Sequence, residues 1–221
     1  MRRSLLVLPA AALLAVSLPV VANATHRPGH QPGRGGADLT VAAKPTTIVF
    51  GGATVISGRL RGPNNAGRTV RLRADGYPFN VGDAVVASTQ TGSNGSYSFT
   101  QRPDRNTNYQ VTLGAVRSQR VRVNVRFRMS LRVSDSTPRA GQLVRFSGRA
   151  CPESDGAVVS IQRQSSSGRY RTVRRTRLRA ATTCSTYSRR LRVHRDGRYR
   201  ATVDDAARAR GYSRSRLLNA H

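Results

Sequence analysis

Tryptophan is absent from this 221-residue chain, and aromatic residues of all kinds make up only 5% of it. Lysine occurs once, at Lys44, and glutamate once, at Glu153. Binding of sugars by stacking on aromatic rings is therefore disfavoured, although a protein partner is not. Glu153 and nine scattered aspartates supply neither the paired carboxylates of glycoside hydrolysis nor the spacing of a calcium loop.

The chain also lacks the motifs of common catalytic and nucleotide-binding sites. No G-x-S-x-G nucleophile motif, Walker motif or G-x-G-x-x-G loop is present. A Ser-His-Asp set could be assembled from Ser185 or Ser188 with His194 and Asp196, but no motif supports it. A structural metal site usually needs four fixed ligands, which the few histidines do not supply. We expect no enzymatic activity, no cofactor and no metal.

Charge of one sign dominates the composition. The chain has 38 Lys and Arg residues against 10 Asp and Glu residues, which gives a formal net charge of +28. Such an excess favours polyanionic partners. Sequence-specific recognition of nucleic acid is not expected, because the chain has no recognition helix, zinc finger or aromatic-rich sheet motif. The length and a hydrophobic fraction of 38% suit one or two domains with small cores.

The N-terminus has the pattern of an export signal. Arg2 and Arg3 precede an apolar stretch over residues 5–21, and residues 22–24 (Ala-Asn-Ala) form the pattern that signal peptidase reads. We expect residues 1–24 to be a signal peptide cleaved after Ala24, so that the mature protein is secreted or associated with the cell envelope. Residues 25–36 (THRPGHQPGRGG) are predicted to be a disordered leader. No later apolar run is long enough to predict a transmembrane span.

An internal repeat of about 90 residues organises the remainder of the chain. The matching segments are residues 51–59 with 141–149, residues 67–72 with 156–161, Tyr97 with Tyr187, and residues 109–113 with 199–203. A unit of this length has the size of an immunoglobulin-like sandwich. We therefore expect two domains, over residues 37–127 and 128–221.

Within each copy the apolar residues alternate with a period of two, which is typical of β-strands. The clearest run is residues 120–129 (RVRVNVRFRM), where every second side chain, from Val121 to Met129, is apolar. Turn-forming pairs such as Asn94-Gly95 and Asp196-Gly197 separate the runs. The sequence predicts an all-β fold of two tandem immunoglobulin-like β-sandwiches, with about seven strands each.

The repeated motifs also resemble those of a known group of proteins. Each copy contains Leu-x-Val, a proline, a glycine-led run ending in Ser-Gly-Arg, a second glycine-led apolar run and a tyrosine-led strand. This order is similar to that of bacterial immunoglobulin-like domains of exported actinobacterial proteins, and it covers almost the whole mature chain. The resemblance implies a secreted or cell-surface accessory module without catalytic residues.

Tyr109 and Tyr199 occupy matching places in the two copies, three residues after Asn106 and Asp196. This arrangement resembles the tyrosine corner of β-sandwiches, in which the phenol hydroxyl caps nearby backbone. We expect a structural role for both tyrosines. The alternative is that they contact a ligand.

The two cysteines, Cys151 and Cys184, both lie in the second copy. In an exported chain they are expected to form one disulfide within that domain. It would join the end of the strand that follows residue 141 to the start of the strand that carries Tyr187. The absence of a Cys-x-x-Cys motif argues against a redox-active or metal-binding pair.

The positive charge is concentrated in the second copy. Eleven arginines, Lys44 and four aspartates give residues 37–127 a net charge of +8, whereas 22 arginines and six acidic residues give residues 128–221 a net charge of +16. The densest segments, residues 169–179 and 189–200, both have the pattern of strands. If those strands are neighbours, they form a cationic sheet surface.

We hypothesise that this surface contacts an anionic cell-wall polymer or another polyanion through counterion release and arginine–phosphate or arginine–carboxylate pairs. The candidate contacts are Arg169, Arg171, Arg174, Arg175, Arg177, Arg179, Arg189, Arg190, Arg192, Arg195, Arg198 and Arg200. One alternative is that the arginines only keep the surface soluble and the edge strands unpaired. Another is that the chain is an adhesin-like module for a specific protein or carbohydrate.

Overall fold

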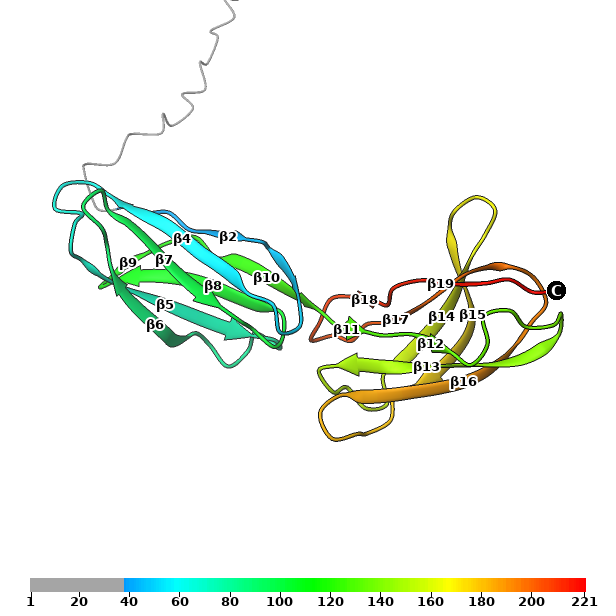
Figure 1. Ribbon diagram of the computed structural model, residues 1–221. Helices are drawn as coiled ribbons and strands as arrows, with labels where there is room; N and C mark the ends of the chain where they lie inside the picture. Colours follow the sequence, from blue (N-terminus) through cyan, green and yellow to red (C-terminus); the bar gives the residue numbers. More distant parts are fainter. Residues whose placement is uncertain (1–37) are drawn as a thin grey trace, which may run out of the picture. The chain divides into compact units, whose positions relative to one another are not determined.

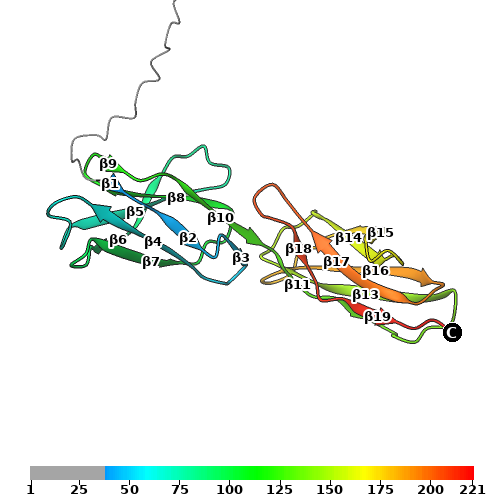
Figure 2. The same ribbon diagram turned by 90° about the horizontal axis from the view of Figure 1, so that it is seen from above.

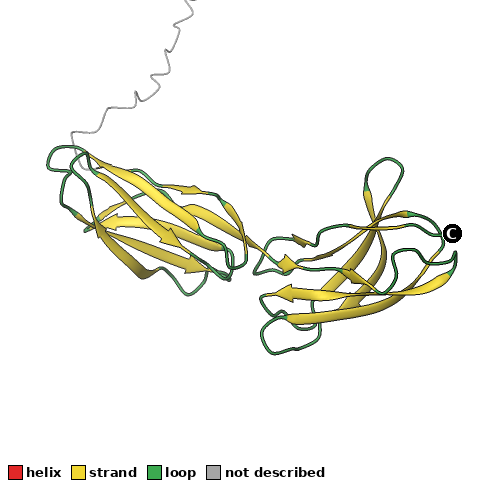
Figure 3. Ribbon diagram, viewed as in Figure 1, coloured by secondary structure: helices red, strands yellow, loops and turns green. Residues whose placement is uncertain are grey.

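The structure, a computed structural model, describes residues 38–221 (Figure 1). The expected signal peptide (1–24) and leader (25–36) lie outside the described residues. All regular elements of the described chain are strands joined by loops and turns (Figure 3). Residues 38–221 accordingly contain no helix with the length and hydropathy needed to cross a membrane. The all-β prediction is confirmed, and the strands form two tandem β-sandwiches.

The first sandwich consists of two sheets. One sheet holds β1 (Asp38–Leu39), β2 (Ala42–Lys44) and β7 (Ser96–Gln101), all paired with β4 (Thr54–Arg61). The other has the order β3 (Thr47–Val49), β10 (Val121–Arg126), β8 (Thr107–Leu113), β5 (Thr69–Gly76) and β6 (Ala84–Gln90), with β9 (Val116–Arg117) on β8. β3 and β10 run parallel, and the other ladders are antiparallel. This division of strands is that of an immunoglobulin-like sandwich.

The second sandwich repeats this arrangement (Figure 2). In its first sheet, β13 (Gln142–Cys151) pairs with β11 (Arg128–Met129), β12 (Arg132–Val133) and β16 (Ser185–Val193). Its second sheet has the order β15 (Tyr170–Arg177), β14 (Val158–Gln164), β17 (Gly197–Val203) and β18 (Gly211–Tyr212), with β19 (Arg216–Leu218) on β17. Strands β4, β5, β6, β7 and β8 therefore correspond to β13, β14, β15, β16 and β17.

The repeat extends to individual hydrogen bonds. In the first sandwich the backbone N–H of Val111 donates to the hydroxyl of Ser118 over 2.9 Å, and in the second the N–H of Ala201 donates to the hydroxyl of Ser213 over the same distance. The ladders of β5 with β6 and of β14 with β15 also shift register at corresponding places. Positions in the two sandwiches can therefore be compared residue by residue.

Each sandwich has its own hydrophobic core between its two sheets. The first core includes the fully buried Ile56, Val70, Leu72 and Val111, and the second includes Phe146, Val159, Ile161, Val203 and Leu218. Burial of apolar side chains such as these is the main favourable contribution to the stability of both domains.

The alternating run over residues 120–129 does not form one strand. The structure divides it into β10 and β11, because β10 pairs with β3 and β8 whereas β11 pairs with β13. Val123 and Val125 lie in the first core, and Phe127 lies in the second. One continuous alternation thus supplies apolar side chains to two domains.

Candidate functional site

The arginines of the expected cationic surface lie mainly on β15 and β16, which are edge strands of opposite sheets. β15 pairs with β14, and β16 pairs with β13, so the two strands are not partners within one sheet. They nevertheless lie side by side at one margin of the sandwich. Just beyond β15, Arg179 and Thr186 exchange two backbone hydrogen bonds of 2.8 Å, which connect the two sheets there. The arginines therefore line a sandwich margin rather than a single flat sheet face.

The side chains of this margin are open to solvent. Of the twelve candidate arginines, all but Arg200 are exposed. Arg171, Arg174, Arg175 and Arg177 lie on β15, and Arg189, Arg190 and Arg192 on β16; Arg169, Arg179 and Arg195 lie in adjoining segments, and Arg198 and Arg200 on β17. Within residues 38–221, none of the five salt bridges involves any of the twelve. The exposed guanidinium groups are thus available to an external anion. We refer to the seven arginines on β15 and β16 as the arginine margin.

The corresponding margin of the first sandwich carries a single equivalent arginine, Arg102, which follows β7 and donates to the Gly51 carbonyl oxygen as Arg192 donates to that of Gly141. β6 has the sequence AVVASTQ and β7 has SYSFTQ, whereas the equivalent β15 and β16 hold seven arginines between them. Both pairs of strands occupy the same places in the same fold, so the two margins meet the same structural requirements. The arginine margin is therefore a property of the second sandwich and not of the repeated fold.

Like charges face each other across two of the ladders in the second sandwich. Arg190 on β16 lies directly opposite Arg145 on β13, and Arg171 on β15 lies directly opposite Arg163 on β14. Directly opposed like charges destabilise a sheet, by up to about 1 kcal/mol for each pair. These arginines therefore do not stabilise the isolated domain through their mutual contacts.

Two further arginines occupy positions that would ordinarily face the core. Arg189 lies opposite the buried Phe146, and Arg174 lies opposite the buried Ile161, so each shares a sheet face with an apolar core residue. Both arginines are exposed because their strands are at the edges of their sheets. Inward-facing charge on an edge strand also discourages pairing with another chain.

Arg200 differs from the other candidates because it is only partly exposed and its guanidinium group packs against two aromatic rings. Its Cζ lies 3.8 Å from the ring centroid of Tyr170 and 4.5 Å from that of Tyr212. Its Nε also donates a hydrogen bond of 2.9 Å to the amide oxygen of Gln162. Two cation–π contacts and a hydrogen bond across neighbouring strands indicate a packing role for Arg200.

Tyr109 and Tyr199 are core residues, each with only 3% of its surface exposed. Burial, together with the negative charge of Asp104, raises the pKa of Tyr109 to about 12. Burial also raises the pKa of Tyr199, and the nearby Arg163 guanidinium acts in the opposite direction.

The phenol-to-backbone contact expected of Tyr109 and Tyr199 is made by a different pair of tyrosines. The hydroxyl of Tyr97 donates to the carbonyl oxygen of Thr40, and that of Tyr187 donates to the carbonyl oxygen of Ser130 over 2.7 Å. Tyr97 and Tyr187 each lie opposite a glycine in the neighbouring strand. The missing side chain leaves space for the phenol ring to cross that strand.

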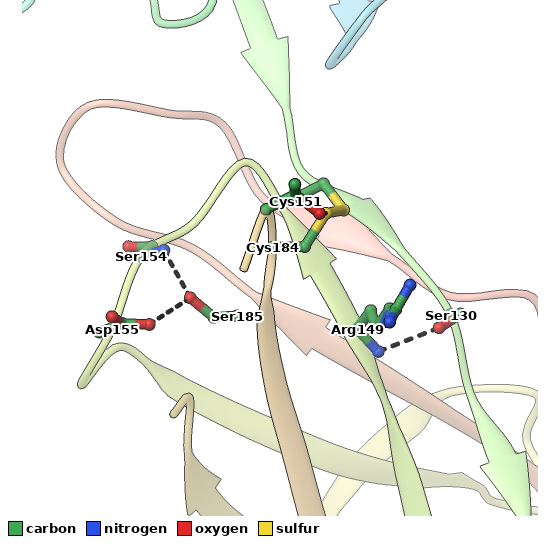
Figure 4. Close-up of a disulfide and its surroundings, with 8 residues drawn as sticks. Ser130, Arg149, Cys151, Ser154, Asp155, Cys184 and Ser185 are labelled. Atoms are coloured by element: carbon green, nitrogen blue, oxygen red, sulfur yellow. Dashed lines mark hydrogen bonds between the residues drawn. A yellow bond between two sulfur atoms is a disulfide. The ribbon is translucent and has the colours of Figure 1, made fainter. Parts of the chain in front are cut away.

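The disulfide between Cys151 and Cys184 is present, as predicted, with a Cα–Cα distance of 4.6 Å (Figure 4). Ala150 pairs with Ser185, so the disulfide joins the next position along the β13–β16 ladder and stays within one sheet. Beside it, the Ser185 hydroxyl donates to the Asp155 carboxylate over 2.5 Å and accepts from the Ser154 N–H over 2.8 Å. The disulfide and this buried serine anchor the loop between β13 and β14.

Of the two serines considered for a catalytic set, Ser188 is exposed on β16, whereas Ser185 is used in structural hydrogen bonds. Ser185 is fully buried, and the carboxylate that it contacts is that of Asp155 rather than Asp196. Asp196 instead accepts a hydrogen bond of 2.6 Å from the backbone of Ala220. Among residues 38–221 no group of three or more His, Cys, Asp or Glu side chains is placed to hold a metal ion.

A pocket of about 270 Å³ opens at one end of the arginine margin. Arg163, Arg192, His194, Arg195 and Tyr199 line it, together with the apolar Val173 and Leu191. We refer to it as the basic pocket. Arg163 was not among the candidate arginines, because it is the only arginine in its part of the sequence. The alignment of the two copies could have identified it, because the residue of the first copy that matches Arg163 is the uncharged Ala74.

Comparisons with known proteins give little further information about this arrangement. No protein-family model matches the chain, and no curated protein matches it. A solved structure described as the "tetra-tandem repeat in extending region of large adhesion protein" is similar, with a TM-score of 0.39 and 19% sequence identity. The similarity covers 83% of this chain and 50% of that one, so this chain spans about half the length of the structure that it matches.

Proposed function

We propose that this protein is a non-enzymatic exported module whose second sandwich binds an anionic polymer of the cell envelope through the arginine margin. The observation that carries the proposal is the contrast between equivalent strands. β15 and β16 hold seven arginines, and only one of them, Arg192, has an arginine at the equivalent position of the first sandwich, Arg102. A general preference for arginine on every surface would have placed it on both margins.

The opposed arginine pairs support the same interpretation. Arg145 faces Arg190, and Arg163 faces Arg171, at a cost to the stability of the unbound domain. A bound polyanion would offset this repulsion, because each phosphate or carboxylate can accept hydrogen bonds from more than one guanidinium group. The charge arrangement is thus more favourable with a polyanion present than without it.

Export is supported by two separate features. The first 24 residues have the pattern of a cleaved signal peptide. The disulfide between Cys151 and Cys184 is a type of bond that persists in oxidising compartments. The polyanions that such a protein would meet are cell-wall polymers and extracellular DNA.

The experiment compares two charge-matched variants with the unaltered protein. In the margin variant, glutamine replaces six arginines of β15 and β16, namely Arg171, Arg174, Arg175, Arg177, Arg189 and Arg190. In the control variant, glutamine replaces six exposed arginines of the first sandwich, namely Arg59, Arg61, Arg68, Arg71, Arg117 and Arg126. Both variants lose the same net charge, and circular dichroism verifies their fold. Binding to purified cell wall and to DNA is then measured over a range of salt concentrations.

We expect the unaltered protein to bind at low salt and to lose affinity steeply as salt rises. The margin variant should lose most of the affinity and show a shallower dependence on salt, whereas the control variant should retain both. Equal losses in the two variants would refute the assignment to the second sandwich. Absence of binding at low salt would refute the proposal, and salt-resistant binding to a single partner would instead favour an adhesin-like module.

A further inference from the structure

The basic pocket of the second sandwich has a counterpart in the first. The counterpart is lined by Ala74, Val86, Asp104, Arg105 and Tyr109 among others. Tyr109 pairs with Ala74 in the β5–β8 ladder, as Tyr199 pairs with Arg163 in the β14–β17 ladder. The two pockets thus occupy the same place in the repeated fold, and their linings can be compared position by position.

The comparison shows a difference in charge at two positions. Arg163 of the basic pocket corresponds to Ala74, and His194 corresponds to Asp104. In the first sandwich the Asp104 carboxylate accepts two hydrogen bonds, of 3.1 and 3.0 Å, from Arg105 and thereby neutralises it. The corresponding Arg195 has a histidine in place of that carboxylate. The basic pocket has therefore gained one cation and lost one anion relative to its counterpart.

Local contacts hold two of the arginines in place. The Nη1 of Arg192 donates a hydrogen bond of 3.1 Å to the carbonyl oxygen of Gly141, which leaves its other N–H groups available. The aliphatic stem of Arg163 lies against Gly197, where an added Cβ would come within 3.2 Å of the Arg163 Cγ and Cδ atoms. These contacts reduce the conformational entropy that the arginines would lose on binding an anion.

We propose that the basic pocket is a phosphate-binding subsite that takes one phosphate group of the anionic polymer. The proposal rests on the proposed function and names the chemistry of its ligand. Arg163, Arg192 and Arg195 come from β14, from β16 and from the segment between β16 and β17. Guanidinium groups that approach from three segments suit the oxygens of a tetrahedral phosphate better than the two coplanar oxygens of a carboxylate. None of the residues that line the pocket is acidic.

The test is a titration of isotopically labelled protein with inorganic phosphate at constant ionic strength, followed by nuclear magnetic resonance. The amide signals of Gly141 and Gly197 report on the basic pocket, and those of Gly51 and Gly76 report on its counterpart. Acetate is titrated in parallel as the carboxylate probe. The key variant combines Arg163→Ala with His194→Asp, which introduces the residues that the first sandwich already carries at Ala74 and Asp104. The repeated fold therefore accommodates both replacements.

We expect phosphate to shift the Gly141 and Gly197 signals saturably and to leave the Gly51 and Gly76 signals unchanged. Acetate should bind about tenfold more weakly, and the double variant should lose phosphate affinity by about tenfold or more. Absence of saturation, equal affinity for acetate, or undiminished affinity in the double variant would each overturn the proposal.

Failure of the phosphate subsite can be distinguished from failure of the proposed function. The margin variant keeps Arg163, Arg192 and Arg195, so it tests polymer binding without altering the pocket. Polymer binding that depends on the margin, combined with no phosphate response at Gly141 and Gly197, would overturn the subsite alone. Phosphate binding in the pocket, combined with no polymer binding at low salt, would overturn the proposed function alone.

Discussion

Gly148 lies directly opposite Tyr187 in the β13–β16 ladder, and a Cβ at position 148 would come within 2.8 Å of the Tyr187 hydroxyl oxygen. The phenol of Tyr187 occupies the space over this glycine, and its hydroxyl donates a hydrogen bond to the Ser130 carbonyl oxygen. Gly58 and Tyr97 have the same relationship in the first sandwich. This packing explains why both copies of the repeat have a glycine at the centre of the sequence Ser-Gly-Arg.

The first prediction concerns this glycine–tyrosine pair. Tyr187→Phe should lower the free energy of unfolding by about 1 kcal/mol, because it removes one hydrogen bond. Gly148→Ala should lower it by about 1–3 kcal/mol, because the added methyl group would overlap the backbone carbonyl oxygen of Ser130 as well as the Tyr187 hydroxyl and so overpack the site. Urea unfolding measures both effects. Ser188→Ala, at an exposed position of the same strand, is the control, and a Gly148→Ala protein as stable as this control would contradict the interpretation.

The second prediction concerns the disulfide. Cys151 and Cys184 are 33 positions apart, and opening a loop of this size should destabilise the protein by roughly 3–4 kcal/mol in the chain-entropy model. Urea unfolding with and without a reductant measures the change. The Cys151→Ala/Cys184→Ala double variant should be comparably destabilised and should not respond to the reductant. An unaltered protein with the same unfolding midpoint under both conditions would show that the disulfide does not contribute to stability.

The third prediction concerns stability in alkaline solution. Burial, with a contribution from Asp38, raises the pKa of Tyr97 from its ordinary value of 10 to about 12. Burial, with a contribution from Asp104, raises the pKa of Tyr109 to about 12 as well. Above pH 10 the unfolded chain therefore loses phenol protons that the folded chain retains. Stability should be unaffected by these groups below pH 10 and should fall as the pH rises from 10 to about 12.

Tyrosinate absorption and circular dichroism, followed together during an alkaline titration, test this prediction. Ionisation of the buried tyrosines should coincide with the loss of β-structure. The Tyr109→Phe variant removes one of the shifted groups, so its stability should decrease less steeply over the same range. Complete ionisation near pH 10 in a protein that is still folded would contradict the assignment of these tyrosines to the core.

The fourth prediction concerns the opposed arginines. Arg145→Glu would place a carboxylate directly opposite Arg190 and should raise the free energy of unfolding by about 0.5–1 kcal/mol at low salt. The gain should shrink as salt screens the pair. Arg149→Glu is the matched control, because Arg149 lies on the same strand opposite the neutral Thr186. Equal gains in the two variants would indicate a general effect of net charge rather than a pairwise one.

The fifth prediction separates Arg200 from the rest of the candidate arginines. Arg200→Gln should destabilise the protein by about 1–2 kcal/mol, because it removes two cation–π contacts and the bond to Gln162. Its affinity for the anionic polymer should be unchanged. The matched change Arg175→Gln, at an exposed position, should leave stability within about 0.5 kcal/mol of the original. If Arg200→Gln lowered the affinity for the polymer more than Arg175→Gln did, Arg200 would have to be counted among the residues that bind the polymer.

Local patterns in the sequence were sufficient for the architecture. The alternation with a period of two and the repeat of about 90 residues predicted an all-β chain of two tandem sandwiches. The pair Cys151 and Cys184 predicted the one disulfide, because a chain with only two cysteines allows only one intramolecular pairing. These features depend on spacing along the chain, which is visible without knowledge of contacts.

The tertiary structure decided which strands are partners and which side chains are free. Local alternation does not predict that β15 and β16 belong to opposite sheets. It also does not predict that the Arg200 guanidinium group packs against the rings of Tyr170 and Tyr212. The same is true of the phenol-to-backbone contacts of Tyr97 and Tyr187, because the Tyr187 contact depends on Gly148 in another strand. Alternation assigns a side chain to one of two faces, whereas pairing between strands distant in sequence determines what that face contacts. The excess of arginine and its concentration in two segments of the second copy were therefore evident from the sequence, whereas only the folded chain shows that these segments lie at one margin between the two sheets.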